Sequence, residues 1–170
     1  TVTNYGTISG SGVFGIDMSS GKVTNFGTIL SVNAIAIAGA GVVINTGYVS
    51  ASATAGFAIE ITGAGSVANG SPSQPSAGIY GFYNGVEVFG SATVANDGTI
   101  IGARAYGIYG KQGGVVTNGT ATDTAAVITG GKLGINFENA GTIPNYGTIT
   151  GPGFAGVFTV YTYIQPILTQ

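Results

Sequence analysis

The sequence predicts an all-β fold: a single β-solenoid of about seven coils, which we expect to be a right-handed, three-sided parallel β-helix. Two observations predict it. One asparagine recurs every 20 to 27 residues along the chain, and branched apolar residues recur at fixed distances from it. No segment has the 3.6-residue period of an amphipathic helix, whereas apolar residues spaced by two are typical of strands. Repeats of this length that each supply three short strands stack into a solenoid.

The recurring asparagine marks the start of each coil. The seven asparagines are Asn4, Asn25, Asn45, Asn69, Asn96, Asn118 and Asn145. A β-branched residue stands two positions before each of them: Val2, Val23, Val43, Val67, Val94, Val116 and Ile143. We expect this column to form one stacked line in the core, because β-branched residues favour strands.

Two further columns are expected to line the other two sides of the core. Four positions after the asparagine stand Ile8, Ile29, Val49, Ile100 and Ile149, and the fourth and sixth repeats depart from this pattern. A column in the middle of the repeat holds Ile16, Ile37, Ile59, Val86, Ile108, Ile135 and Val157. The whole chain, residues 1–170, is therefore predicted to be one domain.

The asparagine column has two interpretations. Stacked side-chain amides can donate to one neighbouring coil and accept from the other, which would satisfy polar groups at a tight corner. Alternatively, asparagine is there for its tolerance of a left-handed backbone at a turn, without any ladder. We favour the ladder. The glycine two positions later is expected to supply a positive φ; it is present as Gly6, Gly27, Gly47, Gly98 and Gly147.

Two insertions lengthen the fourth and sixth coils at the same corner, at residues 70–83 and 119–131. Insertions at one corner of a solenoid gather on one flank and often form a binding face. We expect both loops to project from that flank, with Arg104 beneath it. Tyr80, Phe82 and Tyr83, together with Arg104, are the candidate ligand or partner surface, in which the rings stack on a sugar, pack on a neighbour or fold back over their own coil.

Composition and charge argue against several functions. Charged residues make up 6% of the chain and the net charge is −2, so no basic surface for nucleic acid is present. No apolar run is long enough to be a transmembrane segment. The chain has no histidine and no cysteine, which excludes histidine-dependent catalytic triads and thiolate metal sites. The six acids are scattered, Glu87 with Arg104 being the one pairing of note, and nothing in the sequence indicates an enzyme, a cofactor or a metal ion.

The repeats resemble those of a known group of proteins. The segments "VTNYGTISGSGVFGI", "VTNFGTI" and "VANDGTIIGARAYGIYG" resemble the β-strand repeats in the passenger regions of autotransporter-type bacterial surface proteins. The resemblance covers nearly the whole chain. It implies a β-solenoid exported to the cell surface or the extracellular space. It implies no single activity, because such passengers include adhesins, matrix proteins and some enzymes.

Two functions of different class follow from these observations. The first is a secreted structural protein that self-assembles into a filament, matrix or surface layer; its scarcity of charge favours this. We expect its first coil, near Val2 and Tyr5, to pack head to tail on the last coil of another copy, near Tyr161, Tyr163 and Ile164, because neither end carries a cap. The alternative is an adhesin module that recognises glycan or a host surface through the loop aromatics, and a polysaccharide lyase or hydrolase is a remote third.

Overall fold

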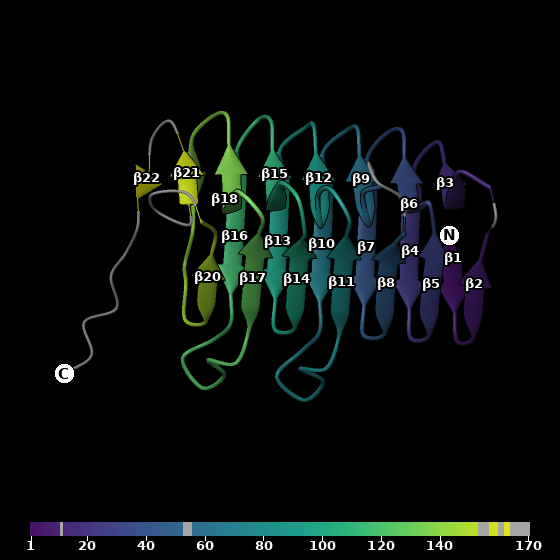
Figure 1. Cartoon of the computed structure of the whole chain (residues 1–170), viewed down its shortest axis with the longest axis horizontal. Coiled ribbons are helices and arrows are strands. Elements are labelled where there is room, and N and C mark those ends of the chain that lie inside the picture. The colour runs from purple at the N-terminus through teal and green to yellow at the C-terminus, as the bar shows by residue number, and fades with distance from the viewer. Residues whose placement is uncertain (11, 53–55, 153–156, 160–161, 164–170) are drawn as a thin grey trace.

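The computed structural model of the chain describes residues 1–10, 12–52, 56–152, 157–159 and 162–163. These residues form a three-sided parallel β-helix, as predicted, in which strands of three sheets alternate along the chain. Figure 1 shows the coils lying side by side along the long axis, from the purple N-terminal coil to the yellow C-terminal one. A membrane-spanning helix is not found in any of these ranges.

The described strands are divided among three sheets, and strands that are neighbours within a sheet come from successive coils. The first sheet contains β1 (Val2–Asn4), β4 (Gly21–Asn25), β7 (Gly41–Asn45), β10 (Gly65–Asn69), β13 (Ala92–Asn96), β16 (Gly114–Asn118), β19 (Gly141–Thr142) and β22 (Thr162–Tyr163). The second contains β2 (Thr7–Ser9), β5 (Thr28–Ser31), β8 (Tyr48–Ala51), β11 (Gly78–Gly81), β14 (Thr99–Gly102), β17 (Val127–Gly130) and β20 (Thr148–Thr150). The third contains β3 (Phe14–Met18), β6 (Asn33–Ile37), β9 (Ile59–Ile61), β12 (Val86–Val88), β15 (Tyr106–Gly110), β18 (Leu133–Phe137) and β21 (Val157–Thr159). Each coil therefore crosses the first, second and third sheets in turn, and β22 begins an eighth coil.

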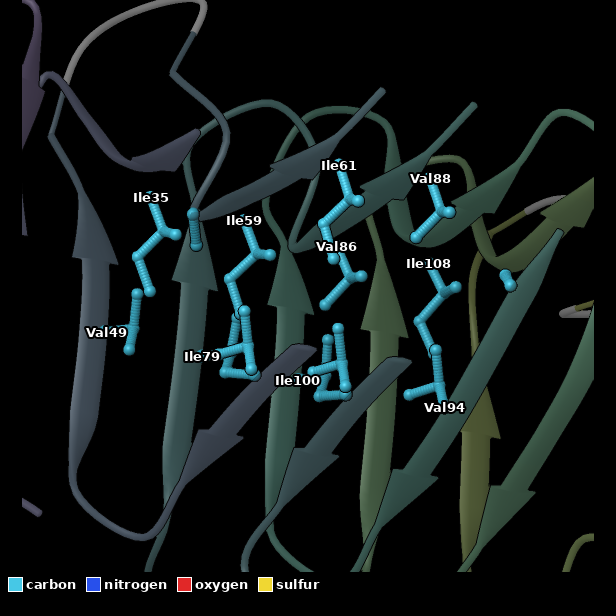
Figure 2. Close-up of a cluster of buried hydrophobic side chains, with 14 of the residues drawn as sticks. Ile35, Val49, Ile59, Ile61, Ile79, Val86, Val88, Val94, Ile100 and Ile108 are labelled. Atoms are coloured by element: carbon cyan, nitrogen blue, oxygen red, sulfur yellow. The ribbon is translucent and has the colours of Figure 1, made fainter. Parts of the chain in front are cut away.

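The first predicted line of the core is confirmed. Parallel pairing places Val2, Val23, Val43, Val67, Val94 and Val116 opposite one another in successive first-sheet strands. From Val23 to Val116 these side chains are buried, and Ile143 of the seventh coil is buried as well. Figure 2 shows buried side chains of this core, which come from strands of all three sheets.

The second line is confirmed and is more regular than the sequence suggested. Ile29, Val49 and Ile100 are buried in the second sheet. In the two longer coils Ile79 and Ile128 take the equivalent positions, paired with Val49 and Ile100. They stand ten residues rather than four after the asparagine, because the inserted loops come between.

The third line was predicted with one residue out of place. Ile35, not Ile37, pairs with Ile16 and Ile59. Ile37 belongs to a second inward line of the third sheet, between Met18 and Ile61. Both isoleucines are buried, and a shift of two residues keeps a side chain on the same face of a strand, so alternation alone does not distinguish the two registers.

The asparagine ladder is present. The Nδ2 of each asparagine donates to the Oδ1 of the asparagine in the next coil, at 2.7–2.8 Å, in six successive steps from Asn4 to Asn145. Most Nδ2 atoms also donate to a carbonyl of their own turn and to one in the next coil; for Asn45 these are Gly47 O and Gly78 O. The alternative, a left-handed backbone at asparagine, is wrong, since no described non-glycine residue has a positive φ.

The glycines two positions after the asparagines serve a different purpose from the one predicted. None of them has a positive φ in the described backbone. Instead, a Cβ at Gly27 or Gly47 would collide with the backbone of the equivalent turn in the preceding coil, and a Cβ at Gly98 with Ala77 O. Glycine is required at these turns because the turns of successive coils approach closely.

The two insertions project from the same flank, as predicted, at the corner between the first and second sheets (Figure 1). They are shorter than expected, because residues 78–81 and 127–130 form β11 and β17. Each loop begins with a glycine of positive φ directly after the ladder asparagine, Gly70 at +80° and Gly119 at +74°. Each then closes on an antiparallel bridge, Ser71 with Gln74 and Thr120 with Asp123.

The largest fully buried side chain, Phe137, depends on two glycines for its space. Gly110 lies opposite Phe137 in the preceding coil, and Gly141 follows it at the start of the next first-sheet strand. A Cβ at either glycine would collide with the Phe137 ring. Large and small residues therefore complement each other between neighbouring coils, which is how cores reach high packing density.

We expect Asn45→Ala to lower the free energy of unfolding by about 1–3 kcal/mol, because it leaves the buried Asn69 Oδ1 and the turn carbonyls without their donor. Asn139→Ala is the matched control: its exposed amide bonds to Lys111 O, a contact that water can replace, so its effect should be small. Urea unfolding of the two variants checks this. Equal stabilities would show that the ladder is energetically neutral.

We expect Gly110→Ala to destabilise the fold by about 1–3 kcal/mol through overpacking against Phe137. Combining it with Phe137→Leu should recover part of that loss, because the smaller side chain makes room for the added methyl group. A double-mutant cycle of unfolding free energies measures this coupling. Additive effects would mean that the two positions do not share their space.

Candidate binding pocket on the third sheet

A line of polar and aromatic residues crosses the outer face of the third sheet. Pairing places Glu60 beside Glu87, then Tyr109, then Asn136 in successive coils. These residues alternate along their strands with buried ones, such as Val86 and Ile108, which fixes their side chains on the outside. The line runs along the rod, with a rise of about 4.8 Å from one strand to the next.

Asn84 fixes one end of this arrangement. It is buried in the corner between β11 and β12, and its Oδ1 accepts a hydrogen bond from the backbone N–H of Tyr106 at 3.1 Å. Its Nδ2 donates to Glu87 Oε2 at 2.9 Å. The amide therefore joins two coils and holds the Glu87 carboxylate in a set position.

Two tyrosine rings form the middle of the arrangement. Tyr106, the first residue of β15, and Tyr109, three residues further along it, stack with centroids 5.7 Å apart and ring planes within 18° of each other. The hydroxyl of Tyr109 donates to Glu138 Oε1 at 2.5 Å. Phe89 meets the same ring edge to face at 6.2 Å. Each ring of the Tyr106–Tyr109 pair covers one face of the other, and the outer face of the stack is a flat apolar surface with polar groups along its margins.

These residues surround a pocket of about 230 Å³, lined by Tyr83, Asn84, Glu87, Tyr106, Tyr109, Asn136 and Glu138. A larger hollow of about 600 Å³ lies across the first sheet, but it is lined by glycine, alanine, serine, threonine, one valine and Lys22. That hollow exists because its residues are small, and it gathers no set of side chains suited to a ligand. The smaller pocket is the candidate site.

The carboxylates of this face are held in an unfavourable environment. Burial raises the pKa of Glu87, and the hydrogen bond from Asn84 opposes part of this rise. Burial also raises the pKa of Glu60, with a further contribution from the charge of Glu87 beside it. The pKa of the Tyr109 hydroxyl is raised by burial and then by Glu138, which keeps it a hydrogen-bond donor.

The structure brings together part of the predicted ligand surface. Tyr83 lines the pocket and is 42% exposed. Phe82 and Arg104 lie at the neighbouring corner, where the guanidinium carbon is 5.1 Å from the centre of the Phe82 ring. Tyr80 is half-buried on β11, in the second sheet between Ser50 and Ile101.

Two details of the predicted surface are wrong. The three aromatics are not in the projecting loop, which ends before β11. Arg104 is not beneath the loops, because it lies between β14 and β15, at the opposite end of the second sheet. The pairing of Glu87 with Arg104 does not form either: among the described residues each is engaged elsewhere, with Asn84 and Phe82.

The residues predicted to mediate assembly are described in part. Val2 is half-buried and pairs with Val23, and Tyr5 is 78% exposed. The Tyr5 ring stacks on Phe26, with centroids 4.9 Å apart and planes within 5°. Tyr163 lies in β22 opposite Thr142, while Tyr161 and Ile164 lie outside the described residues.

Sequence reasoning missed most of the pocket, although one signal was available. Glu87, Tyr109 and Asn136 are 22 and 27 residues apart, the same intervals that separate Asn96, Asn118 and Asn145. Applying the repeat to outward positions as well as inward ones would have placed them in one line. Asn84 stands 22 residues before Tyr106 and so shares the interval, but its bond to Glu87 follows from the geometry of the corner; Glu138 carries no such signal, because it follows from the end of a strand.

The chain matches no protein-family model, no curated protein sequence and no solved structure.

The raised pKa values predict that the protein becomes less stable as pH increases through the range just above 4.5, the ordinary value for glutamate. In this range the unfolded chain has released protons that the folded chain still binds at Glu60 and Glu87, so the free energy of unfolding falls with rising pH. Thermal unfolding from pH 4.5 to pH 7 checks this.

Glu87→Gln tests whether the raised glutamate pKa values cause this dependence on pH, because it removes the titrating group but keeps the shape of the side chain and the hydrogen bond from Asn84. It should make the dependence on pH shallower, and Glu60→Gln combined with it should make it shallower still. Stability that rises with pH in the unmodified chain would contradict the prediction.

Proposed function

We propose that this chain is a structural β-solenoid of the bacterial cell surface or extracellular space, which builds an extended assembly by stacking coils end to end. The proposal rests on the observation that each coil contacts the next one through the same set of interactions. Each step along the rod uses parallel strand pairing in three sheets and one amide-to-amide hydrogen bond, and the next coil meets the same surface again. A coil supplied by another copy would fit the same surface.

The first coil illustrates what such a copy would meet. Asn4 Oδ1 accepts from the backbone N–H of Gly6 in its own turn. The later asparagines accept from the amide of the coil before, and Asn96 also accepts from Gly98 N–H in its own turn. A Cβ at Gly6 would have nothing within 4 Å, in contrast to the crowded Gly27 and Gly47. One face of the Tyr5 ring covers Phe26, and the ring as a whole is 78% exposed.

The low charge of the chain supports stacking, and the resemblance of its repeats supports export. The chain has four basic and six acidic residues in 170, so few charges need be desolvated when coils meet. Addition of strands to a sheet edge supplies backbone hydrogen bonds, and a head-to-tail contact of this kind generates an open filament. The location at the surface rests on the resemblance of the repeats to autotransporter-type passengers.

The proposal is tested by following the 170-residue chain with concentration, using electron microscopy and sedimentation velocity. We expect fibres or rods of many copies. Thr3→Lys combined with Tyr5→Lys should give soluble, folded single rods, because both side chains are exposed and the first coil then carries two charges at its edge strand. Tyr48→Lys, a change at an exposed tyrosine on the side of the rod, is the control and should leave assembly intact. Unmodified chain that remains monomeric at its highest soluble concentration would contradict the proposal.

A further inference from the structure

The pocket on the third sheet has a composition that points to one class of ligand. It combines the stacked rings of Tyr106 and Tyr109, the carboxylates of Glu87 and Glu138, and the amides of Asn84 and Asn136. We propose that it binds one ring of a neutral saccharide chain. This site is independent of end-to-end stacking, since it lies on the side of the rod.

The shape of the pocket suits a single sugar ring. Its volume of about 230 Å³ lies below the roughly 300–1,000 Å³ of clefts that enclose drug-sized molecules. The two tyrosine rings stack within 18° of parallel, so the flat apolar wall is the outer face of this stack. A sugar ring presents C–H bonds on its faces and hydroxyl groups around its rim. The apolar face can lie on the tyrosines while the hydroxyls reach the polar margin.

The polar margin suits hydroxyl groups. Ionised carboxylates accept hydrogen bonds from neighbouring hydroxyls, and such charge-assisted bonds are stronger than neutral ones. Glu87 and Glu138 are positioned for this by the Asn84 amide and the Tyr109 hydroxyl. Asn136, which stands beside Tyr109 in the next coil, offers both a donor and an acceptor.

The charges around the pocket argue against anionic ligands. None of its lining residues is basic. Two cations are engaged with aromatic rings outside it: Arg104 lies over Phe82, and the Lys111 ammonium is 5.7 Å from the centre of Phe89. A phosphate, sulfate or uronate group would meet two carboxylates and no positive charge, which disfavours it by several-fold at least.

The outward line extends the site along the rod. Glu60 continues it on one side of Glu87, and Asn136 continues it on the other side of Tyr109. A linear saccharide lying over this line would contact successive coils, each about 4.8 Å from the next. We therefore expect longer oligosaccharides to bind more tightly than a single sugar.

Tyrosine fluorescence provides the measurement, because the chain has nine tyrosines and no tryptophan. The probes are neutral hexose hexasaccharides of different linkage, the corresponding monosaccharides, an amino-sugar hexasaccharide and a polyuronate hexasaccharide. The Thr3→Lys, Tyr5→Lys chain is used throughout, so that the outcome does not depend on assembly. We expect at least one neutral hexasaccharide to bind, more tightly than its monosaccharide, and the polyuronate not to bind.

Two variants place the binding at this pocket. Tyr106→Ala removes one of the two stacked rings, and with it the support of the other, and should weaken binding by about tenfold or more. Glu87→Gln keeps the shape and should weaken it by several-fold. Tyr48→Ala removes an exposed tyrosine of the second sheet and should change nothing; circular dichroism confirms that each variant is folded. Binding that survives Tyr106→Ala, absence of binding to every neutral probe, or binding of the amino-sugar alone would each overturn the proposal.

Discussion

The rod depends on one constraint: every coil must rise by the same amount at all three corners. Three parallel sheets join the coils in register, so any side chain that separates two coils locally would break backbone hydrogen bonds in each sheet. This constraint explains the glycines two positions after asparagine, such as Gly27 and Gly47, better than backbone conformation does. The turns of successive coils lie so close that a Cβ at Gly27 or Gly47 would strike the neighbouring backbone. It also explains how Phe137 is accommodated, since its bulk is offset by glycine in the adjacent coil rather than by a larger rise.

The asparagine ladder answers a problem that the same close approach creates. At the corner between the first and second sheets, carbonyl groups of two coils converge on a buried asparagine amide and need donors there. An asparagine amide supplies donors for these carbonyls and an acceptor for the amide of the coil before. Aspartate has the same shape but no donor, and it would place a buried negative charge against carbonyl oxygens. The side chain is thus selected for its pairing capacity, while its backbone keeps an ordinary negative φ.

The sequence predicted the coil number, the ladder and the inward lines because, in a stacked repeat, the residues that contact one another recur at a regular spacing along the chain. It failed where two placements satisfy the same pattern. Ile35 and Ile37 both face inward, and the register between β3 and β6, which decides between them, comes from hydrogen bonds rather than from alternation. The loop boundaries failed for a related reason: Ile79 and Ile128 continue the inward line, but the insertions hide their distance from the asparagine. Predicting the pocket would have required the distances between side chains on the two sides of a corner, such as Asn84 and Glu87, and spacing in the sequence does not give these distances.

The division between a fixed interior and a free exterior explains how a scaffold of this kind could also carry a binding site. Inside, each line must remain apolar and each turn must keep its asparagine, so the positions of all outer side chains are set by residues that cannot vary freely. Outside, neighbouring coils can differ. Ala36, Glu60, Glu87 and Tyr109 occupy successive places in one line, and they range from a small apolar side chain to an acid and an aromatic ring. At the adjoining corner, the amide of Asn84 is hydrogen-bonded to the Tyr106 backbone and the Glu87 carboxylate, and it takes no part in the asparagine ladder. A rigid core thereby holds a few variable side chains at set distances, which is the condition that a preorganised site requires.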